Sequence, residues 1–283
     1  MYQCFRRDAT SPTHIINKMG PYIITRGQAI VQDEALLKSP IDFAKQLLNF
    51  KEEIDHMVTQ SFASDVQFTK CRDASFRQFM NACDYTPAHL AYYTDEELKR
   101  GLKGASDDEV DRRLTAIVRL FCCLDGRDIY IRAYTGFLAK RLLNKTLLSK
   151  AAEEKMLEKL KIECGVNVTN GISKMFSDMD LSKDLQIEFV KQRGPQFAGI
   201  TFTAEVLTQG IWTTEKAPNC KIPLPMKQCT DSFKLFYTSK HHNRRLEWLF
   251  LHGQCEVTPL FADKPYQLIT TVFQVSILDL FNN

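Results

Sequence analysis

Residues 106–126 read SDDEVDRRLTAIVRLFCCLDG, and this stretch indicates the dominant fold class. It starts with a serine that suits a helix N-cap, and acidic residues fill the first turn, where they stabilise the positive end of the helix dipole. Its apolar residues then recur at helical spacing, as Val110, Leu114, Ile117, Phe121 and Leu124. Asp125-Gly126 ends the pattern. The stretch therefore predicts an amphipathic helix with one buried face.

Similar signals recur on both sides of this helix. Ser39-Pro40 and Thr86-Pro87 each combine a capping residue with a first-turn proline, and Ser149 begins another helical pattern that Gly165 closes. Residues 86–190 are therefore predicted to form successive helices joined by short turns. Short turns keep consecutive helices next to each other, so we expect an antiparallel bundle.

The character of the sequence changes after residues 193–195, Arg-Gly-Pro. Residues 200–207 are rich in β-forming side chains that partly alternate, which predicts a strand. A hairpin over 246–261 and a further strand over 266–272 are predicted on the same grounds. Apolar spacing over 273–281 predicts a last helix. The fold class is thus expected to be mainly α, with a small α+β part that contains a mixed sheet.

The composition is that of an ordinary globular protein. The chain has 283 residues, 44% of them apolar, which is enough for one large core or a few modest ones. Its net charge of +3 is too small for a protein that binds nucleic acid over its whole surface. No apolar run approaches the roughly 18–20 residues that cross a bilayer, and no secretory signal opens the chain. We therefore expect a location in the cytoplasm or nucleus and no membrane partner.

The cysteine and histidine pattern does not predict a metal centre. The sequence has nine cysteines, an odd number without a C-x-x-C pair, which is typical of reduced, buried thiols. Possible ligands gather in one segment, as Cys229, His241, His242, His252 and Cys255. Their irregular spacing differs from the paired knuckles of tetrahedral zinc sites. We predict neither a metal site nor a cofactor.

Catalytic motifs are not found in the sequence either. It contains no glycine-rich phosphate loop, no G-x-S-x-G and no H-E-x-x-H. Carboxylate pairs such as Asp107-Asp108 stand in first turns of predicted helices, where acids have a structural role. The basic run 240–245, KHHNRR, could contact phosphates, but it lacks stacking aromatics, and a solvated loop is the favoured interpretation. We predict no active site, and nucleic-acid binding remains the weaker alternative.

Several ordered blocks of the sequence resemble the cullins, the elongated scaffolds of multi-subunit RING ubiquitin ligases. The blocks are 138–143 (LAKRLL), 156–165 (MLEKLKIECG), 175–185 (MFSDMDLSKDL), 206–212 (VLTQGIW), 236–249 (FYTSKHHNRRLEWL) and 266–282. Residues 1–84 are similar to the last helical repeat of the cullin stalk. Two positions depart from the family pattern, with Thr213 in place of a proline and His242-Asn243 in place of Ser-Gly. Asparagine tolerates a positive φ, so the turn can persist.

The resemblance implies three parts. A helical stalk repeat covers 1–84, a helical bundle of the cullin homology domain covers 85–193, and the α/β part of that domain covers 194–283. The resemblance also implies that two elements lie outside this chain: the repeat that docks substrate adaptors, and the winged-helix element with the lysine that accepts a ubiquitin-like modifier. We therefore expect a shortened or partial cullin-like chain.

The function implied by the resemblance is that of a non-catalytic scaffold. Such a scaffold holds a RING-type protein and so supports ubiquitin-dependent protein degradation by proximity. In the family, the RING partner adds an extended strand to the α/β sheet. Phe202, Val206, Trp248 and Phe250 are the wall residues expected for that strand, although all four could equally belong to the internal core. The competing hypothesis is a regulatory or vestigial protein that sequesters a RING partner or a cullin exchange factor.

Overall fold

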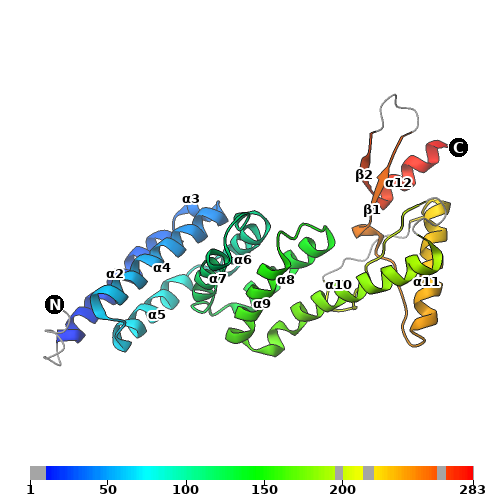
Figure 1. The fold of residues 1–283 in the computed structure, drawn as a ribbon. Helices are drawn as coiled ribbons and strands as arrows, with labels where there is room; N and C mark the ends of the chain where they lie inside the picture. Colours follow the sequence, from blue (N-terminus) through cyan, green and yellow to red (C-terminus); the bar gives the residue numbers. More distant parts are fainter. Residues whose placement is uncertain (1–10, 195–199, 213–219, 260–265, 283) are drawn as a thin grey trace. The chain divides into compact units, whose positions relative to one another are not determined.

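The computed structural model describes residues 11–194, 200–212, 220–259 and 266–282 (Figure 1). The helices and turns of its first part are α2 Ser11–Val31, α3 Glu34–Leu37, α4 Pro40–Phe62, α5 Val66–Met80, α6 Thr86–Glu96, the π-helical turn η1 Glu97–Gly101, α7 Asp107–Phe121, α8 Arg127–Leu143 and α9 Lys150–Cys164. The remaining elements are α10 Val166–Arg193, α11 Leu224–Lys240, the 3₁₀ turn η2 Phe250–His252, β1 Gln254–Val257, β2 Leu268–Thr271, α12 Val272–Asp279 and η3 Leu280–Asn282. Contacts divide the chain into two compact units, unit 1 (Met1–Ile172) and unit 2 (Ser173–Asn283). The three-part division at residues 84 and 193 stays a prediction.

The caps predicted at Ser106 and Ser149 are confirmed, whereas Ser39 makes no side-chain cap bond to α4 and Thr86 is the first residue of α6 rather than its cap. Ser106 precedes α7, and its Oγ accepts a hydrogen bond from the backbone N–H of Glu109 at 3.3 Å. Ser149 caps α9 in the same way through the N–H of Ala152 at 3.2 Å. Gly165 follows α9 with a φ of +81°, a conformation that favours glycine. The predicted fold class, mainly α with a small α+β part, is also confirmed.

In unit 1, the helices α2, α4 and α5 lie side by side around an aromatic core (Figure 1). The rings of Phe50, Phe76 and Phe79 pack with centroid distances between 5.0 and 6.1 Å. Helix α2 approaches this core closely because Gly27 has no side chain. A Cβ atom at Gly27 would lie 2.3 Å from the ring atom Cδ1 of Phe79, which is far inside contact distance.

Replacing Gly27 with alanine should therefore lower the free energy of unfolding by roughly 1–3 kcal/mol, the usual cost of overpacking a core. Gly136 in α8 provides a matched control, because a Cβ atom there meets nothing within 4 Å. At Gly136 the same substitution should stabilise the chain by about 0.5–1 kcal/mol, since alanine loses less backbone entropy in a helix. Urea denaturation followed by circular dichroism measures both changes in the free energy of unfolding. If both substitutions stabilised the chain, or both destabilised it, the close approach at Gly27 would be contradicted.

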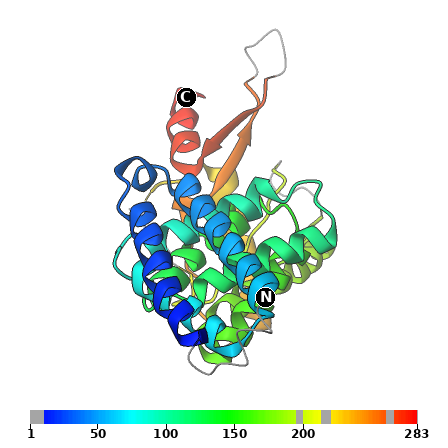
Figure 2. The same ribbon diagram turned by 90° about the vertical axis from the view of Figure 1, so that its left-hand side faces the viewer.

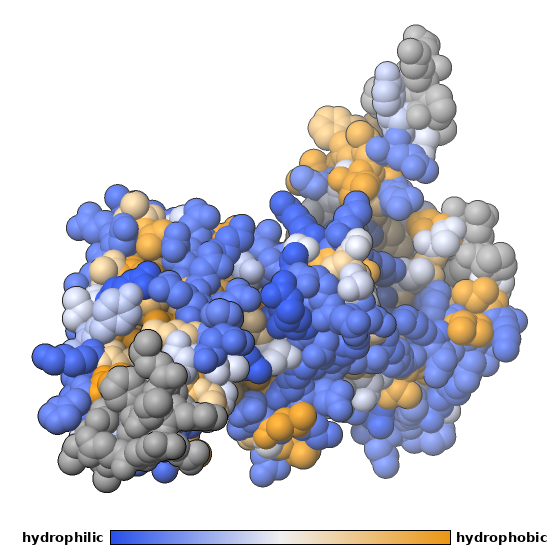
Figure 3. All heavy atoms as spheres, turned by 60° about the vertical axis from the view of Figure 1, so that its left-hand side comes forward, coloured by the Kyte–Doolittle hydropathy of each residue, from blue (hydrophilic) through white to orange (hydrophobic). Residues whose placement is uncertain are grey.

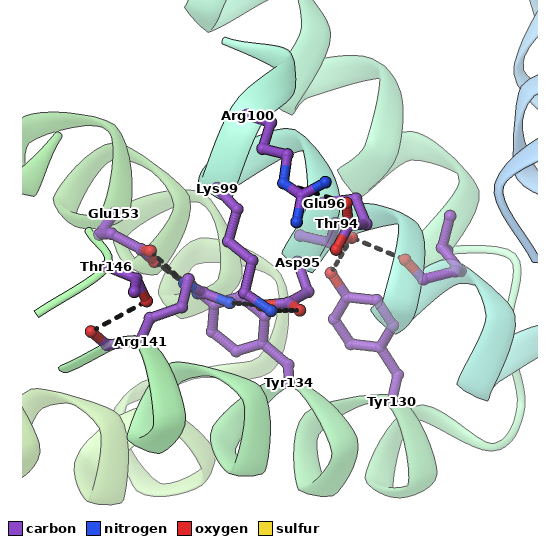
Figure 4. A network of polar contacts seen from close by, with 11 residues as sticks. Thr94, Asp95, Glu96, Lys99, Arg100, Tyr130, Tyr134, Arg141, Thr146 and Glu153 are labelled. Atoms are coloured by element: carbon purple, nitrogen blue, oxygen red, sulfur yellow. Dashed lines mark hydrogen bonds and ion pairs between the residues drawn. The ribbon is translucent and has the colours of Figure 1, made fainter. Parts of the chain in front are cut away.

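A buried charge network joins α6, α8 and α9 in unit 1 (Figure 4). The guanidinium of Arg141 donates to both carboxylate oxygens of Glu153, at 2.7 and 2.9 Å, and also to Asp95. These three side chains are at most 1% exposed. The hydroxyl of Tyr134 donates to Glu153 at 3.0 Å, and Lys99 pairs with Asp95 from a partly exposed position. One cation of α8 thus connects carboxylates of two other helices.

Unit 2 has a separate core and a two-stranded sheet. Its core cluster consists of Phe189, Ala204, Phe233, Phe236 and Tyr237. Strands β1 and β2 pair antiparallel, with Gln254 opposite Thr271 and Val257 opposite Leu268. Helix α12 follows β2 directly and lies against both strands (Figure 2). Thr271 begins α12 with a capping box, because its Oγ1 accepts from the N–H of Gln274 and the Gln274 side chain accepts from the N–H of Thr271.

Two strand predictions are wrong. The strand predicted over 200–207 is not formed, because Ile200 is a single bridge residue and 201–207 belong to no strand, although their sequence alternates as that of a strand would. The hairpin predicted over 246–261 is also absent from its described part: Phe250–His252 form a 3₁₀ turn, and β1 pairs with β2 instead. Gly253 after this turn lies so close to α12 that a Cβ atom would be 2.5 Å from Val272 Cγ2. The strand predicted over 266–272 is confirmed as the shorter β2, and the last predicted helix is confirmed as α12.

Candidate partner-binding site

Side chains of α10 hold the backbone of residues 201–208, which we call the extended segment. The side-chain amide of Gln186 makes two hydrogen bonds to it. Gln186 Nε2 donates to the carbonyl of Phe202 at 2.7 Å, and Gln186 Oε1 accepts from the N–H of Ala204 at 3.2 Å. One glutamine amide thus satisfies a backbone acceptor and a backbone donor, as a residue of a neighbouring strand would.

Two further residues of α10 continue this pattern. Ser182 Oγ accepts from the N–H of Val206 at 2.7 Å and donates to the carbonyl of Val206 at 3.2 Å. Asp178 accepts from both the N–H and the hydroxyl of Thr208 at 2.8 Å, and from the indole N–H of Trp212 at 2.9 Å. Asp178, Ser182 and Gln186 are called the polar row below. The polar row is hydrogen-bonded to backbone groups of every second residue of the extended segment, from Phe202 to Thr208.

The side chains of Phe202, Ala204 and Val206 point to the core of unit 2, whereas that of Thr208 is exposed and bonds to Asp178. The ring of Phe202 lies 5.9 Å from that of Phe233 and 6.0 Å from that of Trp248, measured between centroids. Ala204 is buried within the cluster, and Val206 packs against it. Of the residues between them in sequence, Thr203 is exposed, and Glu205 and Leu207 are half-buried. The extended segment therefore has one face on the core, and the other face is exposed or half-buried.

The structure brings three of the four predicted wall residues together. Phe202, Val206 and Trp248 are half-buried and pack against the same core cluster. Phe250 is half-buried too, but it lies in η2, and its ring stacks on Trp248 at 6.4 Å. These positions fit both interpretations of the sequence, wall and core, because each side chain contacts the core and still keeps an accessible part. Their contact with a partner stays a prediction.

The polar row was not predicted from the sequence. Its members are spaced by four residues, which places them on one face of a helix. Asp178 and Ser182 are buried, with exposures of 4% and 1%. Regular polar residues on the buried face of a helix are a usable signal, since buried polar groups need partners. The sequence, however, does not show which backbone supplies those partners.

The described residues also bear on two other candidate sites of the sequence, a metal centre and a phosphate-binding basic run. There, no group of three or more His, Cys, Asp or Glu side chains is arranged to hold a metal ion. In the basic run 240–245, Lys240 pairs with Glu188 of α10, and Arg245 pairs with Glu247 at 3.4 Å. The run is thus partly engaged within unit 2. None of the helices in the described ranges is both long and apolar enough to cross a membrane.

Burial makes most of the described thiols poor nucleophiles. It raises the pKa of Cys71, Cys122, Cys123, Cys164, Cys229 and Cys255. The pKa of Cys122 rises to about 12, chiefly through burial and secondarily through Glu163. A thiol must lose its proton to attack a carbonyl group, so these six residues are unsuited to nucleophilic catalysis near neutral pH.

A second apolar surface lies on β2 and α12. Leu268, Ile269, Ile277 and Leu278 are exposed and, with Thr270 and Gln274, line a pocket of about 360 Å³. Apolar side chains gather over this part of the surface (Figure 3). None of the four predicted wall residues lines this pocket, so it is separate from the extended segment.

Comparison with known proteins gives matches along the chain. Residues 1–186 match the family model of the cullin alpha solenoid domain, and residues 206–283 match that of the cullin alpha+beta domain. The chain is 34% identical over 285 residues to Cullin-3 of Dictyostelium discoideum, 31% identical over 284 residues to Cullin-3B of Arabidopsis thaliana, and 35% identical over 285 residues to Cullin-4A of Mus musculus. Each alignment covers 100% of this chain but only 37–39% of the relative. The chain thus spans well under half the length of these proteins.

Proposed function

Because the chain belongs to the cullin family, we propose that it acts as a scaffold part of a cullin-RING ubiquitin ligase. In this proposal its α/β part binds a RING-type protein, and the complex brings a charged ubiquitin-conjugating enzyme close to a substrate. The rate gain then comes from proximity and orientation, and no side chain of this chain takes part in the chemistry. Such a scaffold would support ubiquitin-dependent degradation in the cytoplasm or nucleus.

The extended segment is the observation that carries this proposal. Its backbone is held on one side by α10, and Phe202, Ala204 and Val206 face the core. A segment held in this way is prepared to pair with an added strand, and main-chain hydrogen bonds would then supply affinity. The half-buried Phe202, Val206 and Trp248 would supply apolar contacts to the side chains of that strand.

Val206→Asp should weaken capture of the RING subunit of a cullin ligase by roughly tenfold or more, because it places an unpaired charge against the apolar cluster. Capture is measured by pull-down of the tagged chain with the purified RING protein, and by titration for the dissociation constant. Circular dichroism and tryptophan fluorescence establish that the variant is folded.

Thr201→Asp is the matched control, since it adds the same charge to the same segment on an exposed side chain. It should bind as the unaltered chain does. Val206→Ala, which removes apolar contact without adding charge, should give an intermediate loss and serves if Val206→Asp does not fold. Unaltered capture by a folded Val206→Asp chain would reject this binding site.

A further inference from the structure

One carboxylate of α10 holds the end of the extended segment and the turn that follows it. Asp178 accepts from the N–H and the hydroxyl of Thr208, each at 2.8 Å, and from the indole N–H of Trp212 at 2.9 Å. Between these residues the chain turns: the N–H of Ile211 donates to the carbonyl of Thr208 at 3.3 Å, and Gly210 has a φ of +82°. We call Asp178, Thr208 and Trp212 the Asp178 cluster.

The Asp178 cluster combines a buried acceptor with an exposed donor. Asp178 and Trp212 are 4% and 5% exposed, whereas Thr208 is exposed, as are the next two residues of the turn. By contrast, Ser39 and Thr115 donate to carboxylates that are themselves exposed. Solvent and salt screen a charge added beside an exposed carboxylate far better than one added beside a buried carboxylate. A charge on Thr208 would therefore act directly on the interior of unit 2.

We propose that Thr208 is a phosphorylation site and that its modification separates the Asp178 cluster. In the reaction, the hydroxyl oxygen of Thr208 attacks the γ-phosphorus of ATP bound to a serine/threonine protein kinase. The new O–P bond forms as the bond to the β,γ-bridging oxygen breaks, ADP leaves with that electron pair, and a carboxylate base of the kinase takes the hydroxyl proton. Thr208 is accessible to such an enzyme because it lies in exposed, irregular backbone.

Phosphorylation changes the Asp178 cluster in two ways. It removes the hydroxyl donor of Thr208, and it adds a charge of about −1.5 to −2 next to a buried carboxylate. Like charges repel strongly where water is excluded. Lys174 offsets little of this repulsion, because it is 44% exposed and its Nζ lies 3.8 Å from Asp178. The end of the extended segment should therefore separate from α10, and Trp212 should lose its hydrogen bond.

The first test follows Trp212 in the unbound full-length chain. The chain is produced with phosphothreonine genetically encoded at Thr208, and NMR measures hydrogen exchange of the Trp212 indole N–H. Exchange should become roughly tenfold faster or more, as expected for the loss of one hydrogen bond. The control is the chain phosphorylated at Thr203, which is exposed and lies between the two residues that bond to Gln186. Unaltered exchange after phosphorylation of Thr208 would overturn the proposal.

A second test separates the added charge from the lost hydroxyl. Thr208→Glu adds a charge, whereas Thr208→Val only removes the donor, so exchange of the Trp212 indole should rise more in Thr208→Glu. Asp178→Asn removes the opposing charge but keeps an oxygen that accepts from N–H groups and adds a donor for a carboxylate. In that background Thr208→Glu should not accelerate exchange. Equal acceleration in both backgrounds would overturn the role of Asp178, and this comparison decides the question if the phosphorylated chain does not fold.

Use of the site is tested on the tagged chain isolated from its own cells with phosphatase inhibitors. Mass spectrometry should find phosphate on Thr208, and its absence there would overturn the modification.

For its consequence the inference rests on the proposed function. The chain phosphorylated at Thr208 should capture the RING protein roughly threefold less or weaker still, because Val206 of the apolar wall lies only two residues away. Unchanged capture would overturn this consequence. If the unmodified chain captures no RING protein, the proposed function fails, and the exchange data and mass spectrum still decide the phosphorylation site.

Discussion

Replacing Arg141 with methionine should lower the free energy of unfolding by about 3–5 kcal/mol, the usual cost of breaking a buried ion pair. The guanidinium has 0% exposure and bridges Glu153 and Asp95. Methionine has a similar length but leaves Glu153 buried without its cation, and Asp95 with only the partly exposed Lys99. An unpaired charge in a medium of low dielectric constant is strongly unfavourable. Chemical denaturation followed by circular dichroism measures the loss.

Arg141 remains charged in the folded chain despite its burial. Burial by itself lowers the pKa of an arginine, but the hydrogen bonds and charge of Glu153 outweigh it, so the pKa of Arg141 is raised. Burial also raises the pKa of Tyr134 well above its ordinary value, so its hydroxyl stays protonated and donates to Glu153. The network therefore has fixed hydrogen-bond roles, in which Arg141 and Tyr134 both donate to Glu153.

Arg132→Met is the matched control for Arg141→Met. Arg132 lies on the same helix, is 82% exposed, and approaches Asp128 only to 4.0 Å, so its loss should change stability by no more than about 0.5 kcal/mol. Arg141→Lys should fall between the two, because a single ammonium group cannot form the planar fork that meets two carboxylates. Equal stability of the Arg141→Met and Arg132→Met chains would show that the network contributes nothing net.

The helices could be predicted because their signals are local. Ser106, Ser149 and Gly165 act through hydrogen bonds and backbone angles within a few residues, and the structure has them in those roles. The buried apolar stripe of α7, which contains Val110, Leu114, Ile117 and Phe121, follows the predicted period as well. The close approach at Gly27 was not predictable, since it depends on a ring more than fifty residues away in the chain.

The strands were harder to predict because pairing is not local. Residues 200–207 have the alternation of a strand, and Phe202, Ala204 and Val206 do face the core. Their backbone bonds, however, go to Ser182 and Gln186 of a helix rather than to a strand. Strand β1 pairs with β2, whose residues Leu268–Thr271 follow the predicted hairpin in the sequence. Alternation thus predicted which face is buried, but not what the backbone binds.

For the candidate site too, local features could be predicted from the sequence, and contacts between distant segments could not. Phe202, Val206 and Trp248 could be named from the sequence because apolar alternation indicates a buried face. That they meet around Phe233 depends on how α11 packs on α10, which the sequence does not show. The polar row escaped prediction for a related reason, since its backbone partners lie in a different segment. Its members can be recognised only after helix and segment are placed side by side.

Replacing Phe233 with alanine should lower the stability of unit 2 by about 3–5 kcal/mol, as for other large buried aromatic side chains. Phe233 has 0% exposure, and its ring lies 5.2 Å from that of Phe189 and 6.0 Å from that of Trp248. It therefore joins α11, α10 and the segment before β1. Both tryptophans of the chain, Trp212 and Trp248, lie in unit 2, so the denaturation curve read by tryptophan fluorescence reports the effect.

Leu235→Ala separates this core effect from a general effect of shortening α11. Leu235 is on the same helix but 67% exposed, so its truncation should change stability by no more than about 0.5 kcal/mol. Phe233 supports the ring of Phe202, at 5.9 Å, and through it the apolar wall proposed for the partner strand. Phe233→Ala should therefore also weaken RING capture under conditions where the chain is still folded, whereas Leu235→Ala should not. A large loss of stability with unchanged capture would mean that the partner binds elsewhere on unit 2, away from the extended segment.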